Sequence, residues 1–112
     1  MIETLALPLE RYMDVLSARE KAVASNIANA DTPGYKAKDV DFQAEFQSAM
    51  AGGRPRVVEV AGLKVKNDGN NVSVDREARL LAETALRFEL ASNLARTQIR
   101  MVKSAIQEGR GT

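Results

Sequence analysis

Residues 24–36, ASNIANADTPGYK, decide how this chain folds, because they end one long helix and specify the turn that follows it. Asn26 and Asn29 are poor helix-interior residues, and their side-chain amides can bond to neighbouring backbone. Pro33 and Gly34 fit the two central positions of a type II turn, in which glycine supplies the positive φ. The stretch therefore predicts a helix that stops at a sharply defined turn. Its composition alone is also compatible with an ordinary polar helix terminus.

A long amphipathic helix is predicted ahead of this turn, from residue 9 to residue 30. Pro8 suits the first turn of such a helix. Apolar side chains then follow at alternating three- and four-residue spacing, which forms one apolar seam along a helix. The residues expected in this seam are Leu9, Met13, Leu16, Val23 and Ile27.

A second long helix is predicted from residue 75 to residue 106. Ser73 or Asp75 can cap its start, and Glu77 is favourably placed against the helix dipole in the first turn. The glycines at residues 108–111, EGRG, end the helix. The residues expected in its seam are Leu81, Ala85, Phe88, Ala95, Ile99, Val102 and Ile106.

The residues between the two helices have a different character. Glycine and proline interrupt every candidate helix there, except a short one across residues 42–51. Further on, apolar and polar residues alternate around turn formers. This pattern is typical of one or two short strands or, equally, of a solvated linker that orders only on assembly. The candidate inward positions are Val58, Val60, Leu63 and Val65.

Two apolar helices separated by a polar middle can bury their seams by folding back on each other. We therefore expect a mainly α fold, an antiparallel hairpin or coiled coil with an irregular middle region. The three regions are an N-terminal helix (1–30), a connecting motif with the irregular region (31–74) and a C-terminal helix (75–112).

A second apolar stripe on the C-terminal helix remains uncovered in a single hairpin, and an exposed apolar band of that length marks an interface. The chain is therefore expected to assemble with others. The alternative is a small monomeric bundle in which the middle region folds over the stripe. The stripe consists of Leu86, Leu90, Leu94 and Met101.

Composition excludes several functional classes. With 16 Lys and Arg against 15 Asp and Glu, the net charge of +1 provides no field that attracts nucleic acid or an anionic membrane. The absence of Cys and His removes thiol nucleophiles, the usual metal ligands and the commonest general base. We therefore expect no enzyme activity, no catalytic or metal-binding residue, no cofactor, no small-molecule ligand and no nucleic-acid partner.

The beginning of the chain does not read as a secretory signal peptide, because Glu3 is acidic and no basic region precedes an apolar run. No stretch approaches the ~18 consecutive apolar residues of a membrane span. The protein is expected to be soluble, or to leave the cytosol by another route.

Read as one string, residues 24–36 closely resemble the signature of the flagellar basal-body rod and hook family, S-N-I-A-N-x-x-T-P-G-Y-K, which follows an amphipathic helix. Only about residues 51–69 carry no family signal. Because the middle region leaves no room for the large inserted domain of distal-rod and hook members, the chain resembles the short proximal-rod subunit at the base of the rod. The matching flanks are residues 10–16, 37–42, 71–77, 81–83 and 103–110.

The resemblance implies a structural subunit of the bacterial flagellar rod, which polymerises through its terminal helices, joins the membrane ring and export gate to the rest of the rod, and transmits torque. It also implies export by the flagellar type III system without a cleaved signal peptide, and a periplasmic place in the basal body. The implied partners are other rod subunits, the rod-to-membrane-ring adaptor, export-gate proteins and further copies of this chain. The assembly motif carried over is Asn26, Asn29, Thr32, Pro33, Gly34 and Tyr35.

Phe42, Phe46 and Met50 lie four residues apart, which resembles the short hydrophobic signal by which early flagellar substrates dock at the export gate. The same spacing is one face of a short core helix, and the two interpretations are compatible because export precedes folding. The alternative function for the whole chain is a non-flagellar coiled-coil adaptor or scaffold of a secretion apparatus.

Overall fold

The computed structural model describes the backbone of residues 2–110 and the side chains of residues 7–110. Met1, Gly111 and Thr112, which the predicted terminal regions include, lie outside the described residues. The fold is mainly α, as the sequence predicts. Its elements are α1 (Ile2–Ala28), β1 (Lys38–Asp39), α2 (Phe42–Met50), β2 (Val58–Glu59) and α3 (Val74–Arg110).

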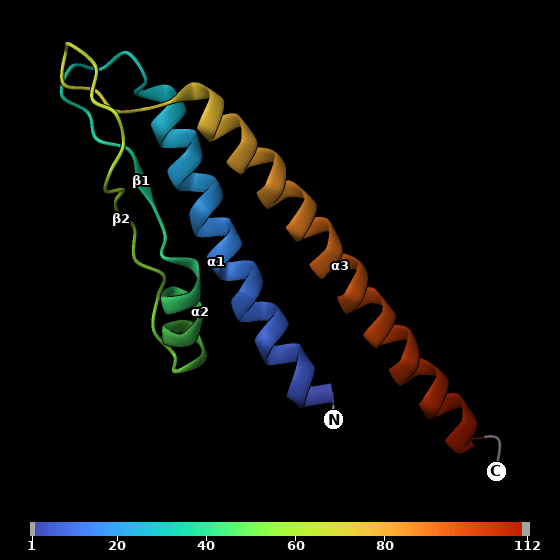
Figure 1. Cartoon of the computed structure of the whole chain (residues 1–112). Coiled ribbons are helices and arrows are strands. Elements are labelled where there is room, and N and C mark those ends of the chain that lie inside the picture. Colours follow the sequence, from blue (N-terminus) through green and yellow to red (C-terminus); the bar gives the residue numbers. More distant parts are fainter. Residues whose placement is uncertain (1, 111–112) are drawn as a thin grey trace.

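The two long helices form the predicted antiparallel hairpin. α1 and α3 lie side by side, and their outer ends point to the same end of the molecule, which we call the open end (Figure 1). The molecule is elongated and measures 72 × 25 × 17 Å. Because α3 has 37 residues and α1 has 27, α3 continues past the start of α1 at the open end (Figure 1).

The middle region packs along α1 on the side away from α3 (Figure 1). α2 covers the helix through a small core in which Val15, Val40 and Ala49 are buried, with Phe42 and Phe46 packed against them. The short helix predicted across residues 42–51 is thus confirmed as α2. α1 is the central layer of the molecule, between α3 and the middle region.

The boundaries of α1 differ from the prediction. The helix begins at Ile2, so Pro8 lies inside it and not in its first turn. Proline lacks the N–H for one backbone hydrogen bond, a local cost that does not end the helix here. α1 ends at Ala28, and the N–H of Asn29 is shared between the carbonyls of Ser25 and Asn26 as the chain leaves the helix.

α3 also extends beyond its predicted end at residue 106. It passes through Gly109 and reaches Arg110. Glycine weakens a helix but does not block it. At the other end, Ser73 is the N-terminal cap, because its Oγ accepts a hydrogen bond of 3.2 Å from the N–H of Arg76.

The middle region contains two short strands. β2 lies in the stretch whose alternation predicted strands, whereas β1 lies before it, and their pairing was not foreseen. β1 and β2 pair antiparallel across α2, with Lys38 opposite Glu59. The expectation that Val58 and Val65 face inward is wrong, since 48% and 52% of their surfaces are exposed, whereas Val60 and Leu63 are half-buried. Apolar alternation predicted an inner face, but among the described residues Val58 and Val65 remain exposed to solvent.

Among the described residues, no helix has both the length and the apolar content to cross a membrane. Nor do they contain a cluster of acidic side chains arranged to hold a metal ion.

Candidate assembly interface

The turn after α1 has the predicted type II geometry. The N–H of Tyr35 donates to the carbonyl of Thr32 over 3.2 Å, and Gly34 has a φ of +77°. A second turn touches this one, since the N–H of Gly34 donates to the carbonyl of Asp68 over 2.9 Å. Gly69 has a φ of +85°, and a Cβ atom there would lie 3.3 Å from the Cα of Gly34. Two glycines therefore allow the backbones to meet.

Asn26 joins the end of α1 to β1. Its side chain is fully buried, and its Nδ2 donates to the carbonyl of Lys38 over 2.7 Å. Its Oδ1 accepts from the N–H of Lys38 over 2.9 Å and from the Tyr35 hydroxyl over 3.2 Å. The amide thus pairs with the backbone of Lys38 as a neighbouring strand would. The sequence predicted a backbone partner for Asn26 but not one 12 residues away.

Asn29 holds the helix end and the turn together. Its Nδ2 donates to the carbonyl of Ser25 over 2.9 Å, and its Oδ1 accepts from the Thr32 hydroxyl over 3.1 Å. The hydroxyls of Ser25 and Tyr35 lie 3.0 Å apart. Pro33 is exposed in the turn. The predicted motif therefore acts first on its own chain, where it fixes the direction of the chain after α1.

Asn70 and Asn71 secure the same turn from the other side. The Nδ2 of Asn70, a fully buried residue, donates to the carbonyls of Asn29 and Thr32, each over 2.8 Å. The Oδ1 of Asn71 accepts from the N–H of Ala37 over 2.6 Å. The sequence did not predict these roles, because the partners lie more than 30 residues away in the chain. The one sign that Asn71 matters was that it begins a stretch resembling the family's C-terminal region. We call Asn26, Asn29, Asn70 and Asn71 the asparagine lock.

An ionic network joins three elements beside the lock. Arg19 of α1 binds Asp39 of β1 with two hydrogen bonds, of 3.0 and 3.2 Å. Arg76 of α3 lies 3.6 Å from the same carboxylate and 3.0 Å from Glu77. Such bidentate, partly buried pairs fix geometry better than single exposed ones. The network therefore ties α1, β1 and α3 into one unit.

The seam of α1 faces α3 along much of its length. Leu16 and Val23 are buried, and Leu9 and Met13 are half-buried. Ile27, the last predicted seam residue, is 39% exposed, because α1 ends one residue later.

The seam of α3 includes part of the predicted set together with residues that were not predicted. Phe88, Ala95 and Val102 are half-buried, whereas Leu81, Ala85, Ile99 and Ile106 are exposed. The buried residues of α3 are Glu77, Thr84 and Ala91, which repeat every seven residues as in a coiled coil. A search for apolar residues passes over Glu77 and Thr84, since both are polar. The seven-residue spacing shared with Phe88, Ala95 and Val102 was the signal that could have found them.

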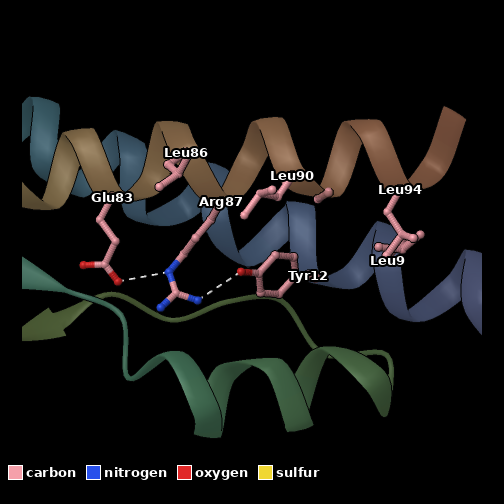
Figure 2. A pocket seen from close by; sticks show the side chains of 8 residues that line it. Leu9, Tyr12, Glu83, Leu86, Arg87, Leu90 and Leu94 are labelled. Carbon is pink, nitrogen blue, oxygen red and sulfur yellow. Dashed lines mark hydrogen bonds and ion pairs between the residues drawn. The ribbon is translucent and has the colours of Figure 1, made fainter. Parts of the chain in front are cut away.

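The second stripe of α3 is exposed, and Figure 2 shows three of its residues, Leu86, Leu90 and Leu94. Their exposed fractions are 59%, 61% and 46%, and that of Met101 is 66%. The first three residues line an open groove of about 480 Å³ between α3 and α1, whose other wall includes Leu9 and Tyr12. The middle region packs on α1 and leaves this stripe uncovered. The monomeric bundle in which it would fold over the stripe is not the fold observed.

Arg87 bridges the layers at the edge of this groove (Figure 2). Its Nη1 donates to the Tyr12 hydroxyl over 3.2 Å, and its Nε donates to Glu83 over 3.0 Å. The Tyr12 hydrogen bond, followed by that of Glu83, raises the pKa of Arg87 above its ordinary value. Arg87 therefore keeps its charge throughout the accessible pH range.

The three residues of the candidate export signal lie on α2. Phe42 and Phe46 are half-buried and meet the ring of Tyr12 edge to face, at centroid distances of 5.4 and 6.1 Å. Met50 is 40% exposed. In the folded chain the two phenylalanines therefore serve as core contacts between α2 and α1.

An elongated helical hairpin with an uncovered apolar stripe is typical of structural subunits that pack through helices. The family described as "Flagella basal body rod protein" matches residues 13–36, which include the helix end and the turn.

Relatives extend this match over most of the chain. The flagellar basal body rod protein FlgB of Borrelia hermsii is 31% identical, over 87% of this chain and 91% of that protein. The FlgB of Escherichia coli K12 is 29% identical, over 89% of this chain and 91% of its own length. That of Salmonella typhimurium LT2 is 28% identical over the same shares. The chain therefore belongs to the family of the flagellar basal body rod protein FlgB, and it is a structural subunit of the proximal rod.

Proposed function

We propose that this chain polymerises through its two long helices in the proximal rod, where it joins the membrane ring and export gate to the rest of the rod and transmits torque. The observation that carries the proposal is the exposed second stripe of α3, in which Leu86 and Leu90 are about 60% exposed. Apolar stripes of this extent are covered in functional assemblies. The role is mechanical, and it requires no catalytic group.

The predicted helix-packing residues divide into two sets in this proposal. Those buried between α1 and α3, such as Leu16 and Val23, hold the hairpin together. Those exposed beside the seam contact neighbouring subunits. The second set consists of Ile27, Leu81, Ala85, Ile99 and Ile106.

The assembly motif supports packing indirectly in this proposal. Asn26 and Asn29 fix the middle region against α1, so that the exposed side of the turn, with Thr32 and Pro33, has one defined position. Neighbouring rod subunits then meet a rigid surface and lose little conformational entropy on binding.

We further propose that the chain is exported by the flagellar type III system in the unfolded state and acts in the periplasm. Phe42, Phe46 and Met50 serve as the export signal before folding and as α2 contacts afterwards. The test replaces Phe42 and Phe46 by alanine and measures secreted and assembled protein separately. Loss of secretion supports the signal, whereas normal secretion with failed assembly would show that these residues act only in the fold.

Deletion of the gene tests the rod function. Electron microscopy of the deletion strain should show cells without rod, hook or filament, and the intact gene supplied in trans should restore all three. The alternative, a coiled-coil adaptor or scaffold of a secretion apparatus, predicts that basal bodies remain visible after deletion.

A further inference from the structure

The open end of the hairpin carries a second groove, distinct from the one in Figure 2 although both include Leu9. It has a volume of about 390 Å³. Its wall from α1 includes Met13, and its wall from α3 includes Ala95, Ile99 and Val102. All these side chains are apolar and at most partly buried within the single chain.

The rim of this groove is acidic. Glu10 and Asp14 line it, both are exposed, and no lysine or arginine is among the described residues that line it. The ionic partner of Asp14 is Arg11, whose Nη1 lies 3.9 Å from the Asp14 carboxylate, too far for a strong hydrogen bond. We call this second groove the acidic-rimmed groove. An apolar floor with an acidic rim suits a helix that presents apolar and basic side chains together.

The end of α3 is such a helix. We call residues 100–110 the α3 tail; they carry Arg100, Lys103 and Arg110 against the single acid Glu108, and all four are exposed. Ile106 is 50% exposed. Lys103, Ile106 and Arg110 follow one another at three- and four-residue spacing, so they share one face of the helix. The tail therefore combines a basic and an apolar surface on one side.

We infer that the α3 tail of one copy docks in the acidic-rimmed groove of a second copy, an inference that rests on the proposed function. The two surfaces match in charge and in apolar content. If the copy that supplies the tail is shifted along the helix axis by about eight residues, ~12 Å, its Lys103 lies level with Glu10 of the copy that supplies the groove. Ile106 of the tail then lies over the groove floor. The tail is available for this contact because its charged side chains and Ile106 are exposed in the single chain.

The geometry of this contact has a consequence for assembly. Apart from Val102, which belongs to both, the groove and the tail consist of different residues, so each copy offers one of each and the contact is heterologous. Heterologous contacts that do not close into a ring repeat into an open, polar filament. A symmetric pair of copies would stop at two, whereas this contact can continue along a rod.

A charge-reversal experiment on the full chain tests the inference. Glu10→Lys/Asp14→Lys reverses the rim, and Arg100→Glu/Lys103→Glu reverses the tail. Sedimentation velocity should show concentration-dependent association of the wild type and an association about tenfold weaker or more for each variant alone. An equimolar mixture of the two variants should associate again, since each reversed surface meets its opposite. Association should weaken as salt increases.

Matched controls separate docking from folding. Glu20→Lys/Glu59→Lys makes the same charge change at exposed positions outside the groove and should associate like the wild type. Circular dichroism should show unchanged helicity for every variant, and the milder Glu10→Gln/Asp14→Asn should give a smaller loss of association in the same direction.

The inference is overturned by a wild type that stays monomeric, by charge variants that associate normally, or by a mixture that stays dissociated. If the mixture fails while the intact gene still restores rods in the deletion strain, the docking inference falls and the proposed function stands.

Discussion

Asn26 shows how one residue fixes the position of a whole segment. Its amide has a donor and an acceptor on the same end, and both pair with the backbone of Lys38, which leaves no unpaired amide group on the buried side chain. An aspartate at this position would lose the donor, and a serine would not reach both groups. The residue is therefore specific in its chemistry and not merely polar.

Replacement of Asn26 by alanine should lower the free energy of unfolding by about 2–4 kcal/mol, because it removes three hydrogen bonds and leaves partly buried backbone groups of Lys38 unpaired. Urea denaturation followed by circular dichroism measures the change. Asn93→Ala serves as the control, since Asn93 is exposed, and it should cost less than about 0.5 kcal/mol. Equal midpoints for the two variants would contradict the structural role of Asn26.

Gly69 and Gly34 allow a second comparison at the residue scale. Both have positive φ, so alanine at either position should cost about 1 kcal/mol through backbone strain. A Cβ at Gly69 also meets the Cα of Gly34 at 3.3 Å, whereas a Cβ at Gly34 has no atom within 4 Å. Thermal denaturation should therefore show a larger loss for Gly69→Ala than for Gly34→Ala. The reverse order would mean that the two turns do not meet as described.

At the scale of elements, the two long helices and the type II turn could be predicted, because three- and four-residue apolar spacing and Pro33-Gly34 are local signals. Helix ends were less predictable, since Pro8 and Gly109 weaken a helix without ending it. The α3 seam was predicted only in part, because Glu77 and Thr84 are polar yet buried. Burial of Glu77 depends on its partner Arg76, which no apolar pattern reveals.

Two leucines on different helices should separate folding from assembly. Leu16→Ala removes a fully buried side chain and should cost about 2–5 kcal/mol. Leu90 is 61% exposed, so Leu90→Ala should change the stability of the isolated chain by less than about 1 kcal/mol. In cells, however, Leu90→Ala should reduce motility in soft agar at normal protein levels. Full motility with Leu90→Asp, a stronger change, would argue against an interface on this stripe.

At the scale of the whole molecule, the layer order explains why the chain suits assembly. α1 is covered by α3 on one side and by the middle region on the other, whereas α3 is covered on one side only (Figure 1). The asparagine lock and the Arg19–Asp39 pair keep the middle region on α1, so it cannot shield α3. The uncovered side of α3 is therefore a consequence of the fold.

The sequence could predict that an apolar stripe on α3 exceeds what one hairpin covers, because this follows from counting apolar faces. It could not predict that the middle region would pack on α1, because the contacts that decide this join residues far apart in the chain. Asn70 contacts residues 38 and 41 positions away, and its neighbours in sequence give no sign of them. Long-range polar contacts of this kind could not be predicted from local sequence patterns.

A map of the assembled basal body, at a resolution that shows side chains, tests the central claim most directly. We expect this chain to form part of the proximal rod with the α1–α3 hairpin intact, and Leu86, Leu90 and Leu94 to be buried against neighbouring subunits. A map in which those leucines face solvent, or in which the chain's own middle region covers them, would contradict it.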